Sequence, residues 1–292
     1  KCWGANELGQ LGDGSVADRT SPRTINVGPG STAIQVSVGG SHTCAIDANG
    51  FVYCWGYNGE GQLGFSNSNE SGDIRITPSL VNLPDNRTAT AISSGNSHTC
   101  ALLDDSSIAC WGLDNYGQAG GTPGGSFQPS TVFIRVGANA SGIEAGDRHT
   151  CANLDDGSMY CWGNNFGGQL TRSNLNEHSN MPLEIPLSSS VTQIMAGGDS
   201  TCAITDDGWL SCWGSNEHGQ RGDGSVCTIE GLSGCPLSLN AGNHVPAKVY
   251  LDDTPAVVTV SAGTSHTCAT MTDGSIQCWG ANDVGQLGDG SN

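Results

Sequence analysis

The chain has 292 residues, of which 44 are glycine and only 13% are charged. Acidic residues outnumber basic ones by 28 to 10, and the resulting net charge of −18 predicts a surface that binds neither nucleic acid nor anionic membranes. No run of about 18 apolar residues occurs, so we expect no membrane insertion in this segment.

The chain begins with Lys-Cys-Trp-Gly, without an initiating methionine, and the phrase Cys-Trp-Gly recurs along its whole length. We interpret this start as that of an internal fragment or a trimmed mature chain. The phrase begins at residues 2, 54, 110, 161, 212 and 278, which indicates a repeat of about 51 residues with two insertions.

Four segments of the first complete unit have the length and residue pattern of β-strands. In chain order they are 21–27 (SPRTINV), 33–39 (AIQVSVG), 42–47 (HTCAID) and 51–56 (FVYCWG). The last two flank Asp-Ala-Asn-Gly, which other tight-turn sequences replace in later units. This part of each unit is therefore predicted to be a β-hairpin.

A proline recurs near the start of the first of these strands, which predicts an edge strand, because proline has no N–H to donate to a neighbour. The prolines are Pro22, Pro78, Pro129, Pro182 and Pro246. A glycine-rich loop such as ANELGQLGDGS follows each Cys-Trp-Gly. Four short strands per unit and no helical pattern predict an all-β chain of β-propeller blades.

These units closely resemble the repeat of the regulator of chromosome condensation family, whose blades follow a G–HT–AL–DG–V–WG–N–GQLG–G series. The resemblance covers essentially the whole chain. It implies a β-propeller, which in this family usually has seven blades. We expect a single propeller domain over residues 1–292, with five complete units and a partial one, so that the ring is either incomplete here or closes with fewer blades.

Thirteen cysteines fall into a regular pattern. Five pairs lie ten residues apart, across the hairpin turn: Cys44 and Cys54, Cys100 and Cys110, Cys151 and Cys161, Cys202 and Cys212, Cys268 and Cys278. Facing positions on antiparallel strands place the Cα atoms about 5 Å apart, which suits a disulfide. A zinc site is the alternative, but this spacing is not typical of zinc ligands and Cys-x-x-Cys never occurs.

Two further features complete the cysteine pattern. Cys227 and Cys235 form a sixth candidate pair inside an insertion, and the partner of Cys2 is expected ten residues upstream, before the first residue. So many disulfides predict an oxidising compartment and hence a secreted, periplasmic or cell-surface protein.

Histidine and tryptophan also repeat in register. Four histidines share one position, His42, His98, His149 and His266, and Asp199-Ser200 replaces it in the fourth unit. A metal or catalytic cluster is one interpretation. We favour side chains that bond backbone near the hub, because equivalent positions on different blades lie too far apart to share a ligand. The repeated tryptophans are predicted to pack between blades: Trp3, Trp55, Trp111, Trp162, Trp213 and Trp279.

Other short motifs carry little specific information. Arg221-Gly222-Asp223 matches an adhesion tripeptide, yet in register it is the GQLGDGS loop with arginine in place of leucine. The Asp-Gly turns lack the acidic pattern of a calcium loop, so we expect no designed calcium site. Asn69, Asn86 and Asn139 begin glycosylation sequons and are candidate glycan sites.

Binding specificity in a repeat protein is expected where loops interrupt the repeat. One interruption is a polar extension at 66–76. The larger is an insertion loop at 226–244, pinned by the candidate pair Cys227 and Cys235. Its apolar residues form a candidate partner-binding site, with self-packing on its own blade as the alternative: Ile229, Leu232, Leu237 and Leu239.

The sequence predicts no enzyme, no cofactor and no metal, because no nucleophile elbow, phosphate loop or catalytic carboxylate pair occurs. We expect a non-catalytic extracellular scaffold or binding module that contacts proteins through loops or by self-assembly. One alternative is a secreted enzyme inhibitor, similar to the propeller-type β-lactamase inhibitor, with Tyr57, Tyr116 and Phe166 in the corresponding loops. A guanine-nucleotide exchange factor is less consistent with the acidic charge and the disulfides.

Overall fold

The structure is a computed structural model that describes residues 1–28, 30–65, 74–121, 138–225, 244–251 and 256–291, together with the backbone of 128–134. Its described regular structure is β-strand in antiparallel sheets, with one short 3₁₀ helix, Pro84–Asn86. The predicted all-β class is confirmed. No helix among the described residues is long and apolar enough to cross a membrane.

The described strands form four four-stranded sheets, one of three strands and one of two. The four-stranded sheets contain β3 (Ala33–Val38), β4 (His42–Asp47), β5 (Val52–Tyr57) and β6 (Ile74–Leu80); β7 (Ala89–Ser94), β8 (His98–Leu103), β9 (Ile108–Gly112) and β10 (Gln128–Ile134); β11 (Ala140–Ala145), β12 (His149–Leu154), β13 (Met159–Gly163) and β14 (Ser179–Glu184); and β15 (Val191–Ala196), β16 (Ser200–Thr205), β17 (Leu210–Gly214) and β18 (Ala247–Lys248). The three-stranded sheet contains β19 (Val257–Ala262), β20 (His266–Met271) and β21 (Ile276–Gly280), and the pair contains β1 (Cys2–Gly4) and β2 (Arg19–Arg23).

The proline-bearing strand belongs to a different sheet from the one that the order of the sequence unit suggests. The segment expected at 21–27 begins earlier, as β2, and pairs with β1 of the preceding Cys-Trp-Gly. The later proline strands likewise form the outer edge of the preceding sheet, as β6 does on β5. The edge position of proline is confirmed, but five sequence units give four complete blades because each blade takes its outer strand from the next unit.

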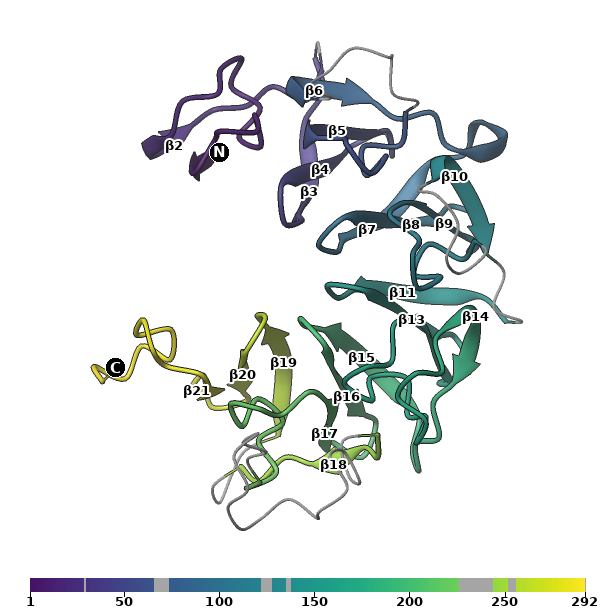
Figure 1. Ribbon diagram of the computed structural model, residues 1–292, viewed down its shortest axis with the longest axis vertical. Coiled ribbons are helices and arrows are strands. Elements are labelled where there is room, and N and C mark those ends of the chain that lie inside the picture. The colour runs from purple at the N-terminus through teal and green to yellow at the C-terminus, as the bar shows by residue number, and fades with distance from the viewer. Residues whose placement is uncertain are drawn as a thin grey trace.

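The sheets follow one another around an open arc (Figure 1). The first strands of successive sheets, β3, β7, β11, β15 and β19, contact one another in order along the inner side. Both chain ends lie on the same side of the view, and no strand among the described residues pairs β1 with β21. The described part of the chain is therefore an incomplete ring.

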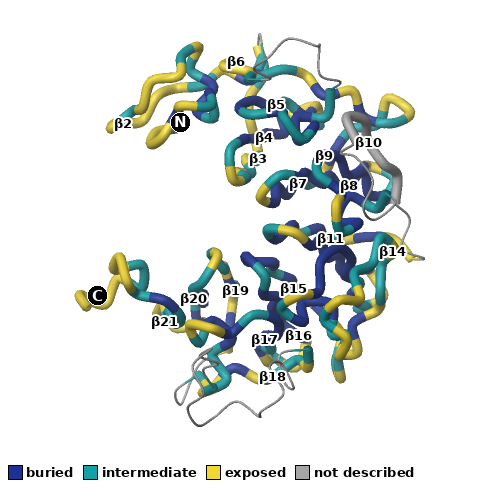
Figure 2. The backbone as a smooth tube through the Cα atoms, viewed as in Figure 1, coloured by how far each residue is buried: buried dark blue, intermediate teal, exposed yellow. Residues whose placement is uncertain are grey.

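Apolar cores lie between neighbouring sheets. Side chains of a strand alternate between its two faces, so Cys44 and Ile46 of β4 point one way and Ala45 points the other. The cysteine face of the first sheet packs on the face of the next sheet that carries Ala101 and Trp111. The same arrangement recurs at the three following junctions. Because both faces are covered, the second strands of the middle sheets are buried throughout (Figure 2).

Burial decreases at both ends of the arc (Figure 2), where this packing lacks a neighbouring sheet. Trp111, Trp162 and Trp213 are fully buried and Trp55 nearly so, as predicted for residues between blades. Trp3 is 60% exposed, and Trp279 is half-buried. The prediction is thus wrong for Trp3, because no described sheet precedes β1 to cover it.

Five of the six predicted disulfides lie among the described residues, one in each repeat. In each the two cysteines face each other directly across the hairpin, as Cys44 and Cys54 do, with Cα atoms 4.1 Å apart. This distance is shorter than the expected 5 Å or so. Cys227 and Cys235 lie outside the described residues, and Cys2 is a free thiol within them.

Candidate functional site

The third strand of each sheet, and likewise β1, is followed by a loop with the sequence pattern Asn-x-x-Gly-Gln. The first side chain is asparagine in five loops and Asp114 in the sixth, and its Oδ1 accepts a hydrogen bond of 2.8 to 3.0 Å from the backbone N–H five residues later. The glutamine Oε1 accepts from the N–H of the second variable residue at 2.8 to 3.0 Å. These two bonds hold all six loops in the same shape.

The same loop also joins each sheet to the next through hydrogen bonds. The backbone carbonyl of Gln62, in the first sheet's loop, accepts from Trp111 Nε1 at 3.0 Å and from Thr99 Oγ1 at 2.9 Å, both in the second sheet. The four other loops that precede a sheet make the same pair of bonds. Sequence reasoning missed this role, although the recurrence of Asn and Gln at fixed spacing signals it.

Glycine is the last residue of each third strand, or in β5 the one before the last, because the chain turns there in a conformation that side chains disfavour. Gly56 has φ of +100°, and a Cβ on it would lie 2.7 Å from the carbonyl oxygen of Ser41. A larger residue would have to displace the backbone beside His42. The glycine therefore sets the close approach from which the loop departs.

Three of the four repeated histidines bond a side chain of the next sheet, and for these three the prediction that they bond backbone is wrong; the fourth, His266, lies in the last described sheet. His42 Nε2 lies 2.8 Å from Thr99 Oγ1, His98 Nε2 lies 2.9 Å from Thr150 Oγ1, and His149 Nε2 lies 3.0 Å from Thr201 Oγ1. Thr99 gives its only hydroxyl proton to the Gln62 carbonyl. His42 is therefore the donor through a proton on Nε2, and in the neutral form of the ring Nδ1 carries no proton.

Burial favours this neutral form. Burial lowers the pKa of His42 and of His149 to about 3 and that of His98 to about 4. The charge of protonated His98 further lowers the pKa of His42 and of His149. No group of three or more His, Cys, Asp or Glu side chains among the described residues could hold a metal ion. The histidine series thus joins sheets, with one bond at each of three junctions.

The inner strands surround a hollow of about 400 Å³ lined mostly by glycine and other small residues. Glu144 of β11 is the acidic side chain on these strands, and its Oε2 accepts from Ser93 Oγ at 3.3 Å. Burial raises the pKa of Glu144 to about 7. A carboxyl that titrates near neutrality lies at the hub of the arc, with a serine hydroxyl as its described partner.

The two variable residues at each loop tip form a surface of distinct composition. Since all third strands run in the same direction, the six tips project from one face of the arc. Four tips carry an acidic residue, and the two central ones carry aromatic residues: Glu7, Glu60, Tyr116, Phe166, Glu217 and Asp283. No tip residue is lysine or arginine. We call this face, made of 7–8, 59–60, 115–116, 166–167, 217–218 and 283–284, the loop-tip surface.

The structure brings two of the three predicted aromatic loop residues together. Tyr116 and Phe166, from neighbouring sheets, have ring centroids 5.7 Å apart. His178, just before β14, completes the aromatic cluster, 4.9 Å from Tyr116 and 4.5 Å from Phe166. Tyr57 ends β5, and the described ring contacts do not include it in the cluster. His178 is a further site residue that sequence reasoning missed, because it lies outside the repeated loop.

The Arg-Gly-Asp sequence is not presented to solvent. The Arg221 side chain is 7% exposed and donates to Asp223, while its backbone N–H is bonded to Asn216. The tripeptide is thus part of the fixed loop, as its register predicts.

Several predicted residues are either exposed or not described. Asn86 and Asn139 are exposed, and Asn139 Nδ2 donates to Asp155 at 3.0 Å. Asn69, most of the extension at 66–76 and the candidate partner loop with Ile229, Leu232, Leu237 and Leu239 lie outside the described residues. The partner-loop hypothesis remains a prediction.

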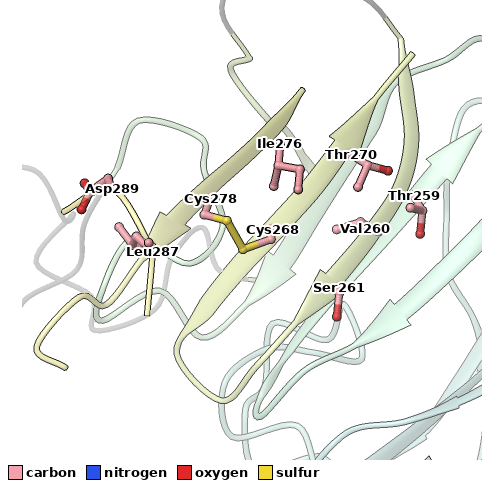
Figure 3. A pocket seen from close by; sticks show the side chains of 10 residues that line it. Thr259, Val260, Ser261, Cys268, Thr270, Ile276, Cys278, Leu287 and Asp289 are labelled. Carbon is pink, nitrogen blue, oxygen red and sulfur yellow. A yellow bond between two sulfur atoms is a disulfide. The ribbon is translucent and has the colours of Figure 1, made fainter. Parts of the chain in front are cut away.

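The last sheet exposes the face that other sheets bury. Cys268, Cys278, Ile276 and Leu287 line an open hollow of about 680 Å³ (Figure 3). The corresponding cysteines of the four other bridges are 0 to 1% exposed. The next sheet covers those bridges, whereas no described sheet covers this one.

We predict that a thiol reductant acting on the native 292-residue chain opens the Cys268–Cys278 disulfide first, at least about tenfold faster than Cys100–Cys110. The buried bridges react only after sheets separate, and 1.4 kcal/mol for that opening already gives a tenfold difference. Timed alkylation followed by peptide mass spectrometry measures the order. Equal rates for all five bridges would show that the final face is covered in solution.

Fixed loops and sheet-to-sheet bonds define a β-propeller chain whose blades are scaffold and whose loop tips vary. Residues 1–292 match the RCC1-like domain, and the chain belongs to that family. The family resemblance predicted from the repeats is confirmed.

Three similar proteins illustrate the range of the family. The ultraviolet-B receptor UVR8 of Arabidopsis thaliana is 32% identical over 291 residues, which cover 99% of this chain and 62% of that protein. A secretion-regulating guanine nucleotide exchange factor of Mus musculus is 28% identical over 300 residues, with 98% and 60% coverage. The solved structure of Prp20p from Saccharomyces cerevisiae, described with its binding properties to Gsp1p and histones, has a TM-score of 0.80 at 24% identity and covers 97% of this chain and 66% of that one. The chain thus spans less than two thirds of each.

Proposed function

We propose that this chain is a non-catalytic protein-binding or structural scaffold module of a larger secreted or cell-surface protein or assembly. The observation that carries the proposal is one disulfide in each repeat, four of them buried between sheets. Such a series forms and persists in an oxidising compartment. The binding of Prp20p to Gsp1p and histones, named with its structure, supports protein binding as the mode of action.

A thiol-trapping experiment tests the compartment. Intact cells that make the protein are treated with N-ethylmaleimide before lysis, and unreduced peptides are analysed by mass spectrometry. We expect each of the five pairs to be linked and unlabelled. Labelled, unlinked cysteines in the four buried pairs would contradict an oxidising compartment.

Cross-linking on intact cells tests the binding role. We expect intermolecular cross-links from this chain to another protein, or to another copy of the chain, and no nucleotide release when the purified chain is added to a small GTPase. The exchange-factor alternative requires that release. A chain that forms no intermolecular cross-link would contradict the scaffold proposal.

The aromatic cluster favours one second candidate, a secreted enzyme inhibitor. Tyr116 and Phe166 lie in the predicted loops and pack together, and Phe166 is still 45% exposed. Inhibition of a secreted hydrolase that is lost in Phe166→Ala would support this candidate over a purely structural scaffold.

A further inference from the structure

The aromatic cluster at the centre of the loop-tip surface is held rigidly. The backbone N–H of Phe166 donates to Asn164 Oδ1 at 2.8 Å, and that of Tyr116 donates to Gln118 Oε1 at 2.9 Å. The N–H of Asn165 donates to His178 Nδ1 at 3.2 Å, which fixes the third ring. Side chains that are already ordered lose little entropy when a partner binds.

The cluster also has the exposure and chemistry of a binding anchor. Phe166 keeps 45% of its surface exposed although two other rings pack against it. Aromatic residues that are rigid and partly exposed are typical centres of binding energy at protein interfaces. An apolar side chain of a partner could cover the remaining Phe166 surface.

The charged residues of the six loop tips are all acidic, and Arg148, whose backbone carbonyl accepts from the N–H of Asn164 at 2.9 Å, is an exposed base beside the aromatic tips. In the order of the sheets, Glu7 and Glu60 precede the two aromatic tips, and Glu217 and Asp283 follow them. Glu7, Glu217 and Asp283 are exposed, and Glu60 is partly exposed. The net charge of −18 adds a long-range attraction for cations. A partner that meets this surface must supply basic groups on both sides of an apolar anchor.

We propose that the loop-tip surface binds a basic segment of another protein, with an apolar side chain on Phe166 and Tyr116 and with lysine or arginine residues beside Glu60 and Glu217. This inference rests on the proposed protein-binding function and names its surface and partner class. The acidic tips exclude nucleic acid and anionic lipid as occupants, since both carry the same sign of charge.

Selection from a phage-displayed library of random 12-residue peptides on the folded chain tests the proposal. We expect enriched peptides to place an aromatic or aliphatic residue between lysines or arginines. Phe166→Ala should weaken their binding at least about tenfold, as expected for a central anchor. Glu60→Gln and Glu217→Gln should each weaken it about threefold and reduce its salt dependence.

Two matched controls lie at the opposite end of the strands, in hairpin turns. Phe51 is 47% exposed, close to the value for Phe166, so Phe51→Ala should leave peptide binding unchanged. Asp206→Asn, in the turn after β16, removes a charge away from the loop tips and should also have no effect. Thermal unfolding without reductant verifies that all variants are folded.

Three outcomes of the selection overturn the inference. They are no enriched peptide, enriched peptides without basic residues, or binding that Phe166→Ala and Tyr116→Ala leave intact. In the last case the protein-binding function stands and only the surface is wrong. Self-association that Phe166→Ala abolishes, measured by sedimentation, would assign the surface to a second copy and would likewise overturn it. Cross-linking on cells decides the proposed function independently.

Discussion

Thr99→Val is expected to lower the free energy of unfolding by about 2 to 3 kcal/mol. The substitution keeps the shape of the side chain but removes a hydroxyl that both accepts from His42 Nε2 and donates to the Gln62 carbonyl. His42 is then left with a buried N–H that has lost its acceptor, which costs about 1 to 3 kcal/mol. The Gln62 carbonyl retains its hydrogen bond from Trp111, so losing the bond from Thr99 costs less free energy than leaving the His42 N–H without an acceptor. Urea unfolding without reductant measures the change.

Thr267→Val is the matched control for this prediction. Thr267 donates to the Gln220 carbonyl, but in the preceding sheet Ser200 occupies the histidine position. Only the bond to the carbonyl is lost, so we expect the free energy of unfolding to fall by about 1 kcal/mol. Thr99→Ser keeps the hydroxyl and should also cost no more than about 1 kcal/mol. Equal losses in Thr99→Val and Thr267→Val would show that the histidine bond contributes nothing.

Acid is expected to destabilise the fold steeply, beginning below pH 6.5. His42, His98 and His149 have native pKa values of about 3, 4 and 3, against about 6.5 when unfolded. Between these values the unfolded chain binds protons that the native chain does not, so stability falls as pH falls. Each histidine contributes up to roughly 1.4 kcal/mol per pH unit in that window.

Glu144 opposes this loss over part of the same window. Its native pKa of about 7 lies above the ordinary value of 4.5, so between pH 7 and 4.5 the native chain holds a proton that the unfolded chain has released. One carboxyl therefore offsets one histidine, and the expected net loss is up to about 3 kcal/mol per pH unit from 6.5 to 4.5. Burial also raises the pKa of Asp114, Asp147 and Asp199, which reduces the loss nearer pH 4.

The Glu144→Gln variant separates the two contributions. Without the opposing carboxyl, the loss should steepen to about 4 kcal/mol per pH unit over the same range. Urea unfolding at a series of pH values, with the disulfides intact, measures both slopes. An unfolding free energy that is equal at pH 7 and pH 5 would contradict neutral, buried histidines.

The features that could be predicted from the sequence are those whose chemistry is complete within one hairpin. Cysteines ten residues apart across a turn face each other whatever surrounds them, so the five bridges were predictable. The proline strand was assigned to the wrong sheet because β5 and β6 pair across a long loop, and that pairing is a tertiary contact. Proline nevertheless marked an edge, since that requirement is local.

The candidate site was harder to predict because its contacts join different repeats. The partner of His42 is Thr99, in another sheet, and a single unit gives no sign of that bond. The meeting of Tyr116, Phe166 and His178 depends on how two blades lie side by side. The fixed Asn and Gln of each loop were visible as a repeated spacing, and only their neighbours in space explain them.

The glutamine carbonyl of each loop that precedes a sheet accepts hydrogen bonds from that sheet, so the two ends of the row of blades differ in what they lack. Removing a blade from the amino-terminal end deprives the new first blade of the acceptor for its tryptophan and threonine, as at Gln62 for Trp111 and Thr99. Removing a blade from the carboxyl-terminal end deprives its neighbour of the acceptors for a histidine, a serine hydroxyl and a backbone N–H, as at Thr150 for His98, Glu144 for Ser93 and Asp147 for Asn96. Gene truncations and recombination junctions are thus not equivalent at the two ends, because each leaves a different set of donors without acceptors.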